Sequence, residues 1–72
     1  MNAKRKFTVV IERDEDGWFV ATVPAIRGCH TQAKNLDTLM KRVREAIQLC
    51  LEVEGAKNVD ALELVGVQQV AV

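Results

Sequence analysis

The chain has 72 residues, of which 49% are hydrophobic and 28% charged, and its ten basic and ten acidic side chains cancel to a formal net charge of zero. This hydrophobic content excludes an intrinsically disordered chain, and the balanced charge argues against a general nucleic-acid binder, which usually carries a basic excess. A chain of this length buries only a small core, so we expect it to need a metal, disulfides, a partner or self-association.

The cysteines and the first residues indicate where the protein works. Cys29 and Cys50 are too few for the disulfide scaffold of a small secreted protein. Residues 1–6 include three basic side chains, but no apolar stretch of a signal peptide follows them. No apolar run approaches the ~20 residues that span a membrane. We therefore expect a cytoplasmic protein with reduced thiols, no membrane contact and one domain over residues 1–72.

Residues 7–12 and 18–23 have the alternation that is typical of two strands in a hairpin. Between them, the dipeptide Asp16-Gly17 predicts the turn, because glycine adopts positive φ without steric cost. One face of the two strands consists of Phe7, Val9 and Ile11 in the first strand and Phe19, Ala21 and Val23 in the second.

The segment after the hairpin predicts a short third strand that leads directly into a helix. Pro24 cannot donate a hydrogen bond to a neighbouring strand, so it ends the second strand. Gly28 marks a turn, and residues 29–33 are long enough for a third strand. Asn35 is a good N-cap, because its side chain can accept a backbone N–H from the first helical turn.

Residues 36–54 have the apolar periodicity of one amphipathic helix, and Gly55 is a natural C-terminal stop. We expect the helix to pack on the sheet through its main apolar stripe. That stripe consists of Leu36, Leu39, Met40, Val43, Ile47, Cys50 and Leu51. A second apolar flank, rotated away from the stripe, consists of Ala46, Leu49 and Val53.

The last segment, residues 62–72, is rich in β-branched residues and predicts a fourth strand that returns to the sheet. Its alternation changes phase around Gly66, which predicts a bulge or a strand with two apolar sides. The expected fold is therefore α+β with the order β-β-β-α-β: a small, mainly antiparallel sheet with one helix packed on one face.

The order and spacing of these features resemble one known family. The features are the hairpin ending in Asp16-Gly17, Val23-Pro24 near the end of the second strand, the run of residues 28–32 (GCHTQ), and the helix that follows immediately. Together they resemble the N-terminal domain of the HicB family, antitoxins that pair with small HicA ribonuclease toxins. The resemblance implies a fold like a truncated ribonuclease H sheet.

The resemblance implies a function by binding. A HicB-like protein would cover the RNA-binding and catalytic surface of a HicA-type mRNA interferase, so it needs no catalytic residue, metal or cofactor of its own. Full-length members of the family usually carry a C-terminal helix-turn-helix or ribbon-helix-helix segment that binds operator DNA. Here the sequence stops after the last predicted strand, so we expect no DNA binding.

Two other function classes stay open on the sequence. One is a stand-alone RNA-binding or structural module of the same fold, favoured by a basic patch that residues 4–6 could form with Lys41, Arg42 and Arg44. The other is a degenerate ribonuclease-H-like nuclease that uses acids such as Glu12 or the cluster at residues 14–16. A solvated helix face and a solvated hairpin tip explain the same residues.

The remaining residues with reactive side chains have structural explanations. His30 and Cys29 are adjacent, so on a strand they point to opposite faces and chelate one ion poorly. Cys50 belongs to the apolar stripe, where a free cysteine behaves as a small hydrophobe.

Several apolar residues have no place in the predicted core and are candidates for contact with a partner or a second copy. We expect the protein to self-associate as a dimer or higher even-numbered oligomer, because the core is small and an apolar last strand is hazardous on a free sheet edge. Trp18 either covers the hairpin or contacts a partner. The candidate interface residues are Trp18, Ala46, Leu49, Val53, Val65 and Val67.

Overall fold

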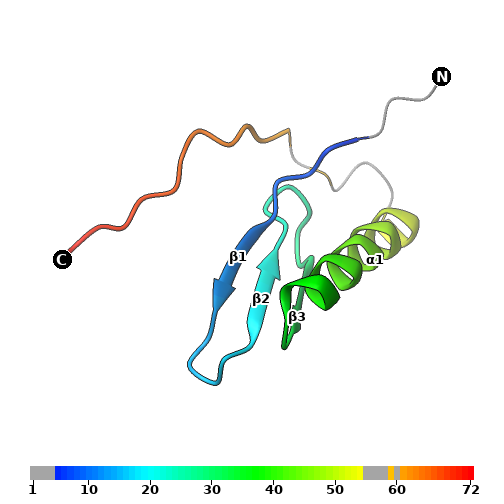
Figure 1. Cartoon of the computed structure of the whole chain (residues 1–72). Helices are drawn as coiled ribbons and strands as arrows, with labels where there is room; N and C mark the ends of the chain where they lie inside the picture. Colours follow the sequence, from blue (N-terminus) through cyan, green and yellow to red (C-terminus); the bar gives the residue numbers. More distant parts are fainter. Residues whose placement is uncertain (1–4, 55–58, 60) are drawn as a thin grey trace.

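A computed structural model describes residues 5–54, 59 and 61–72 of the chain. Its elements are the strands β1 (Val10–Arg13), β2 (Phe19–Thr22) and β3 (His30–Ala33), followed by the helix α1 (Leu36–Glu54) (Figure 1). The strands form an antiparallel sheet in the order β1-β2-β3, and α1 packs against one face of it. The predicted α+β class and the order β-β-β-α are confirmed. The predicted helix stop at Gly55 lies outside the described residues.

All three strands are shorter than predicted. β1 pairs with β2 from Val10↔Thr22 to Arg13↔Phe19, so residues 7–9 precede the paired region. The reason lies in the chain that follows β2. There the backbone N–H of Ile26 donates to the carbonyl of Val23, over 3.1 Å, and turns the chain away just where residues 7–9 would need a partner. Pro24, inside that turn, has no N–H to offer.

The side chain of Asp14 stabilises the hairpin turn through hydrogen bonds to the backbone. The backbone N–H groups of Asp16 and Trp18 donate to Oδ1 of Asp14, over 3.0 and 2.9 Å. The N–H of Gly17 donates to the carbonyl of Asp14, and Gly17 has a φ of 83°, a value that glycine adopts without strain. The predicted turn is confirmed.

α1 has the predicted bounds, and Asn35 caps it as expected. Its Oδ1 accepts the N–H of Thr38 over 2.8 Å, and its carbonyl accepts the N–H of Leu39 over 3.0 Å. Leu39 and Val43 are buried, which confirms the centre of the predicted stripe. The prediction was wrong for two residues of the stripe: Leu36 and Met40 are exposed and do not belong to the buried core.

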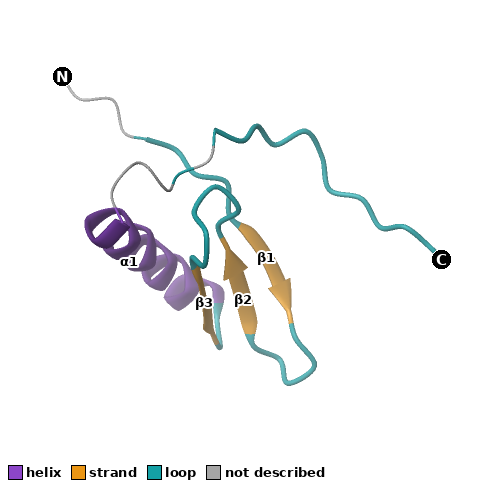
Figure 2. Cartoon of the chain, turned by 180° about the vertical axis from the view of Figure 1, so that it is seen from behind, coloured by secondary structure: helices purple, strands orange, loops and turns teal. Residues whose placement is uncertain are grey.

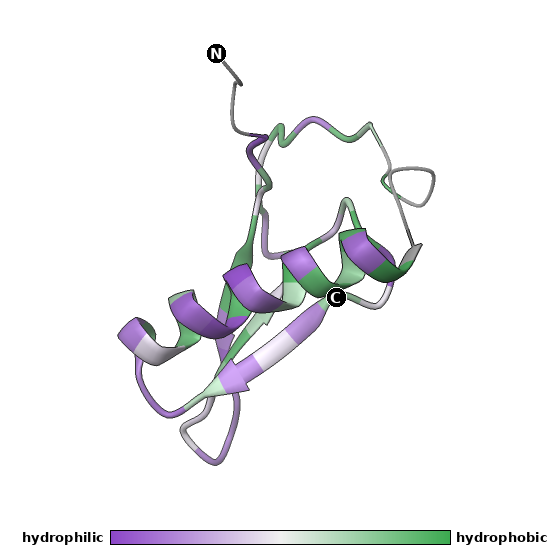
Figure 3. Cartoon of the chain, turned by 90° about the vertical axis from the view of Figure 1, so that its right-hand side faces the viewer, coloured by the Kyte–Doolittle hydropathy of each residue, from purple (hydrophilic) through white to green (hydrophobic). Residues whose placement is uncertain are grey.

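The exposed edge of the stripe follows from where the helix lies. α1 packs chiefly on β3, less on β2, and makes no comparable contact with β1. Figure 3 shows α1 crossing the sheet with mainly hydrophilic residues on its outward side. The core therefore forms under β2, β3 and the loop between them. Its buried members are Ala21, Val23, Ile26, Cys29, Ala33, Leu39 and Val43.

The predicted fourth strand is absent from the described part of the chain. Val59 forms an isolated antiparallel bridge with Ile26. Beyond it, residues 61–72 run as an extended segment without strand pairing, and every one of them is exposed (Figures 1 and 2). We call residues 61–72 the C-terminal arm. The arm has the extended backbone that its β-propensity favours, but the prediction of a paired strand was wrong, because propensity does not supply the neighbouring strand that a sheet requires.

Candidate interaction surface

The offset of α1 leaves a groove on the β1 side of the molecule. Ile11 pairs with the fully buried Ala21 and so lies on the helix-facing side of the sheet, yet it is 43% exposed, because no helix covers β1. Beside it, the segment before β1 and the helix enclose a groove of ≈600 Å³. We call this the β1-side groove; its lining residues are Arg5, Phe7, Val9, Met40, Val43, Arg44, Ile47, Gln48 and Leu51.

The β1-side groove has an apolar floor and a basic rim. Phe7 and Val9 pack against the core from the sheet side, and Met40 is 38% exposed on the helix side. The guanidinium carbon of Arg5 lies 5.1 Å from the centre of the Phe7 ring, where a cation is attracted by the ring's negative face. Arg44 belongs to the same lining. Such a groove suits an apolar segment that carries little positive charge.

The opposite side of α1 is organised differently. The Nη1 of Arg42 donates to the carbonyl of Gln32 in β3 over 2.7 Å, so this side chain ties the helix to the outer strand. Next to it on the helix surface, Leu49 is 60% and Val53 74% exposed. We call Leu49 and Val53 the helix flank. Two exposed aliphatic side chains one turn apart offer a small apolar contact surface.

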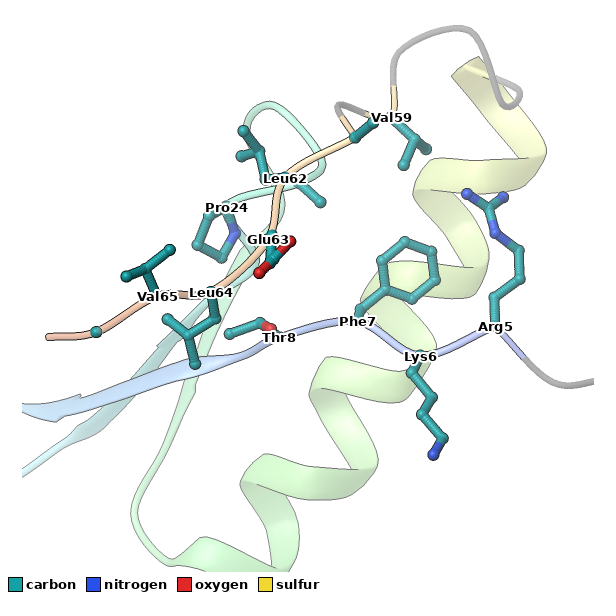
Figure 4. A pocket seen from close by; sticks show the side chains of 13 residues that line it. Arg5, Lys6, Phe7, Thr8, Pro24, Val59, Leu62, Glu63, Leu64 and Val65 are labelled. Atoms are coloured by element: carbon teal, nitrogen blue, oxygen red, sulfur yellow. The ribbon is translucent and has the colours of Figure 1, made fainter.

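The C-terminal arm crosses the end of the sheet before it leaves the molecule. Residues 61–66 lie over the segment 5–8 and over Pro24 and Ala25, and together they enclose a shallow hollow of ≈470 Å³ (Figure 4). The apolar side chains toward the end of the arm are largely exposed, with Val65 at 93%, Val67 at 73% and Val70 at 79%. Residues 64–72 contain no charged side chain. An uncharged, apolar, extended segment of this kind is a typical site of β-strand addition.

Trp18 lies at the other end of the sheet, beside the hairpin turn. It is half-buried, and the Nζ of Lys34 lies 4.3 Å from its ring centre. A similar stack joins Arg13 to Phe19, at 4.8 Å. One face of the Trp18 ring is therefore already occupied by a cation from the residue that follows β3.

The structure places five of the predicted interface residues in three separate regions. Trp18 is at the hairpin, Leu49 and Val53 form the helix flank, and Val65 and Val67 are on the arm (Figure 1). Ala46 is half-buried and packs against the core. The sequence reading missed the β1-side groove, because it placed the residues of that groove in the core. The sequence shows the apolar periodicity of these residues, but it does not show that the helix lies over β3 and β2 and leaves β1 uncovered.

The acidic and imidazole side chains of the described residues do not converge on one site. Asp14 is used in the turn, and His30 is exposed at the start of β3. Within the described residues, no three His, Cys, Asp or Glu side chains are placed to hold a metal ion. Over the same part of the chain, no helix is long and apolar enough to cross a membrane.

Cys29 is a protonated thiol at neutral pH. Burial, together with a hydrogen bond and charge repulsion from the neighbouring Cys50 thiol, raises its pKa from 9.0 to about 11. Because the thiolate is the nucleophile, this site has the character of a packed core cysteine.

Comparison with known proteins adds a family to this geometry. Residues 7–70 match the family model described as "HicB_like antitoxin of bacterial toxin-antitoxin system". A UPF0150 protein of Archaeoglobus fulgidus is 61% identical over 67 residues, which cover 93% of this chain and 94% of that protein. A UPF0150 protein of Synechocystis is 42% identical over 96% of this chain and 97% of its own length. One from Thermotoga maritima is 31% identical over 99% of this chain and 95% of its own length.

Proposed function

Because the chain belongs to the HicB-like antitoxin family, we propose that it neutralises a HicA-type mRNA interferase by steric occlusion. Family membership gives it the antitoxin role of a toxin–antitoxin system and implies a toxin as partner. The match over residues 7–70 is the observation that carries this proposal. The inhibition requires contact with the toxin's RNA-binding and catalytic surface and no chemistry by the antitoxin.

The helix flank is the surface that we assign to the toxin. Leu49 and Val53 are exposed on a rigid helix that Arg42 ties to β3. Apolar side chains on a fixed element lose little conformational freedom on binding, which favours affinity. Their position on the side of α1 away from the β1-side groove leaves that groove for another use.

The test is a protection assay with a HicA-type toxin from the same host. Toxin and RNA are incubated with increasing amounts of this protein, and we expect cleavage to stop near stoichiometric addition. The double variant Leu49→Asp/Val53→Asp should protect at least tenfold less well. Glu52→Gln, on the same helix turn, is the matched control and should protect like the parent. RNA cleaved equally with and without the parent protein would refute the proposal.

We also propose that the protein is not a nuclease. The acid nearest to a ribonuclease-H-like position, Glu12, is exposed on β1, and Asp14 is engaged in the hairpin turn. Purified protein incubated with RNA and Mg²⁺ or Mn²⁺ should leave the RNA intact. Cleavage that co-purifies with the protein and disappears in Glu12→Gln or Asp14→Asn would contradict this.

Self-association as a dimer or higher even-numbered oligomer is part of the same proposal. The small core, the free β1 edge and the exposed arm all support it. Sedimentation equilibrium at micromolar concentration should give a mass that is an even multiple of 8.0 kDa. A single species of 8.0 kDa would rule it out.

RNA binding is the second candidate, because Arg5 and Arg44 line the same groove. An RNA affinity that falls steeply with salt, and that falls further in Arg44→Gln, would favour it. The zero net charge of the chain favours the antitoxin function instead.

A further inference from the structure

We propose that the C-terminal arm of one chain adds as a strand to the free edge of β1 in a second copy, which returns its own arm to the first. The side chains of each exchanged arm cover Ile11 and the β1-side groove of its partner. The inference rests on the proposed self-association and assigns the segment that performs it.

The acceptor is the outer edge of β1. β1 pairs only with β2 within the sheet, so every second backbone N–H and C=O along residues 10–13 faces away from any strand. At the other edge of the sheet, Arg42 satisfies the carbonyl of Gln32 in β3. Among the described residues no side chain donates to or accepts from the backbone of β1. β1 is therefore the edge that is ready to receive a strand.

The surface next to that edge lacks one apolar layer. Ile11 is on the helix-facing side of the sheet but 43% exposed, and Met40 across the groove is 38% exposed. Both are partly exposed for the same reason: the helix covers β2 and β3, and no described helix or strand covers this side of β1. A strand laid along β1 would satisfy the backbone groups and place alternate side chains over Ile11 and Met40.

The donor has the matching properties. The arm is already extended, so pairing requires little rearrangement, and its backbone groups have no partner strand. Val65 and Val67 point one way along the alternation and Val70 and Val72 the other, with Gly66 and the two glutamines between them. The absence of charge over residues 64–72 suits the apolar floor and the basic rim of the groove.

A second copy is the occupant that the geometry favours. The base of each arm is fixed by the bridge between Val59 and Ile26 and by its course over Pro24 and Ala25. From there the arm extends away from its own sheet, so its own β1 edge stays open (Figures 1 and 2). Each chain thus carries one free donor and one free acceptor. Two copies related by a two-fold axis satisfy both pairs and close the assembly.

The experiment compares three full-length proteins by sedimentation equilibrium and hydrogen exchange at micromolar concentration. The parent should be a dimer of twice 8.0 kDa, with the amides of residues 65–72 protected. Val67→Pro removes a backbone donor from the middle of the arm, and it should be a monomer that keeps the parent's helical circular dichroism. Leu49→Asp, on the helix flank, is the matched control and should stay a dimer.

Each of the other outcomes shows whether the arm exchange alone or self-association as a whole is contradicted. A dimer that persists in Val67→Pro would overturn the arm exchange and leave self-association standing. A monomeric parent with a protected arm would show that the arm folds back on its own β1, which overturns the exchange as well. A monomeric parent with an unprotected arm would overturn both, while toxin inhibition would still be decided by the protection assay with the helix-flank variants.

Discussion

Residues 7–53 and the C-terminal arm contain similar apolar residues but differ in how far these residues are buried. In the first region, Val23 and Val43 are almost completely buried between the sheet and α1. In the arm, Val65 is 93% exposed, and Leu64 and Val67 are 58% and 73% exposed. Both regions have the alternation and β-branched residues of strands. The contrast shows that an apolar pattern favours burial of its side chains. Whether they are buried within one chain depends on a neighbouring helix or strand that packs against them.

The largest expected loss of unfolding free energy comes from a substitution in the buried region, and the same substitution in the exposed arm is its control. Val43→Asp places an unpaired charge in the centre of the core and should cost on the order of 3 kcal/mol or more of unfolding free energy. A domain this small should then be unfolded. Val67→Asp puts the same charge on the arm and should keep a folded helix. Circular dichroism with thermal melting compares the two, and equal melting of Val43→Asp and the parent would show that the assigned helix phase is wrong.

The second prediction concerns the pH dependence of stability in the buried region. The pKa of Cys29 in the folded state is about 11, above its ordinary value of 9.0. The folded state therefore binds this proton more tightly than the unfolded state. The resulting stabilisation is complete below pH 9 and is lost as pH rises toward 11.

Urea unfolding of the parent and Cys29→Ala at pH 8 and pH 10.5 measures this. The stability of the parent should fall more between these two values than that of the variant, even though Cys29→Ala starts lower because it leaves a small cavity. Parallel losses in both proteins would show that the thiol has no raised pKa in the folded state.

A smaller effect tests the local signal that starts α1. Asn35→Ala removes the acceptor of the 2.8 Å hydrogen bond from Thr38 and should cost ~1 kcal/mol. Asn35→Ser, which can cap in the same way, should recover most of that loss. Denaturant unfolding measures both. An alanine variant as stable as the parent would mean that packing alone fixes the helix start.

The smallest effect belongs to the arm itself. Val65→Ala removes two methyl groups that face solvent, so in dilute monomer it should change the unfolding free energy by less than ~0.5 kcal/mol. Leu39→Ala, the buried counterpart, should cost ~2–5 kcal/mol. A large effect of Val65→Ala in a monomeric sample would mean that the arm packs on its own chain.

Features that depend on a few adjacent residues were predictable. Asp16-Gly17 specified the hairpin turn, and Asn35 together with the following periodicity specified the start of α1. The interface candidates could be predicted only as apolar residues left over from the core. Ala46 shows the limit of that method, since it is half-buried and packs against the core. The residues of the β1-side groove could not be found, because their exposure depends on which strands the helix covers.

By itself the sequence determined the first three of the four predicted strands, the capped helix and the family, through an antitoxin-like order of motifs. These follow from backbone preferences and side-chain spacing, which act over a few residues at a time. The tertiary structure alone decided that α1 lies over β3 and β2, that Met40 and Ile11 remain partly exposed, and that the last segment is an unpaired arm. The physical reason is that strand pairing and burial depend on contacts between segments far apart in the sequence, and residues 61–72 run past the end of the sheet without pairing with any described strand.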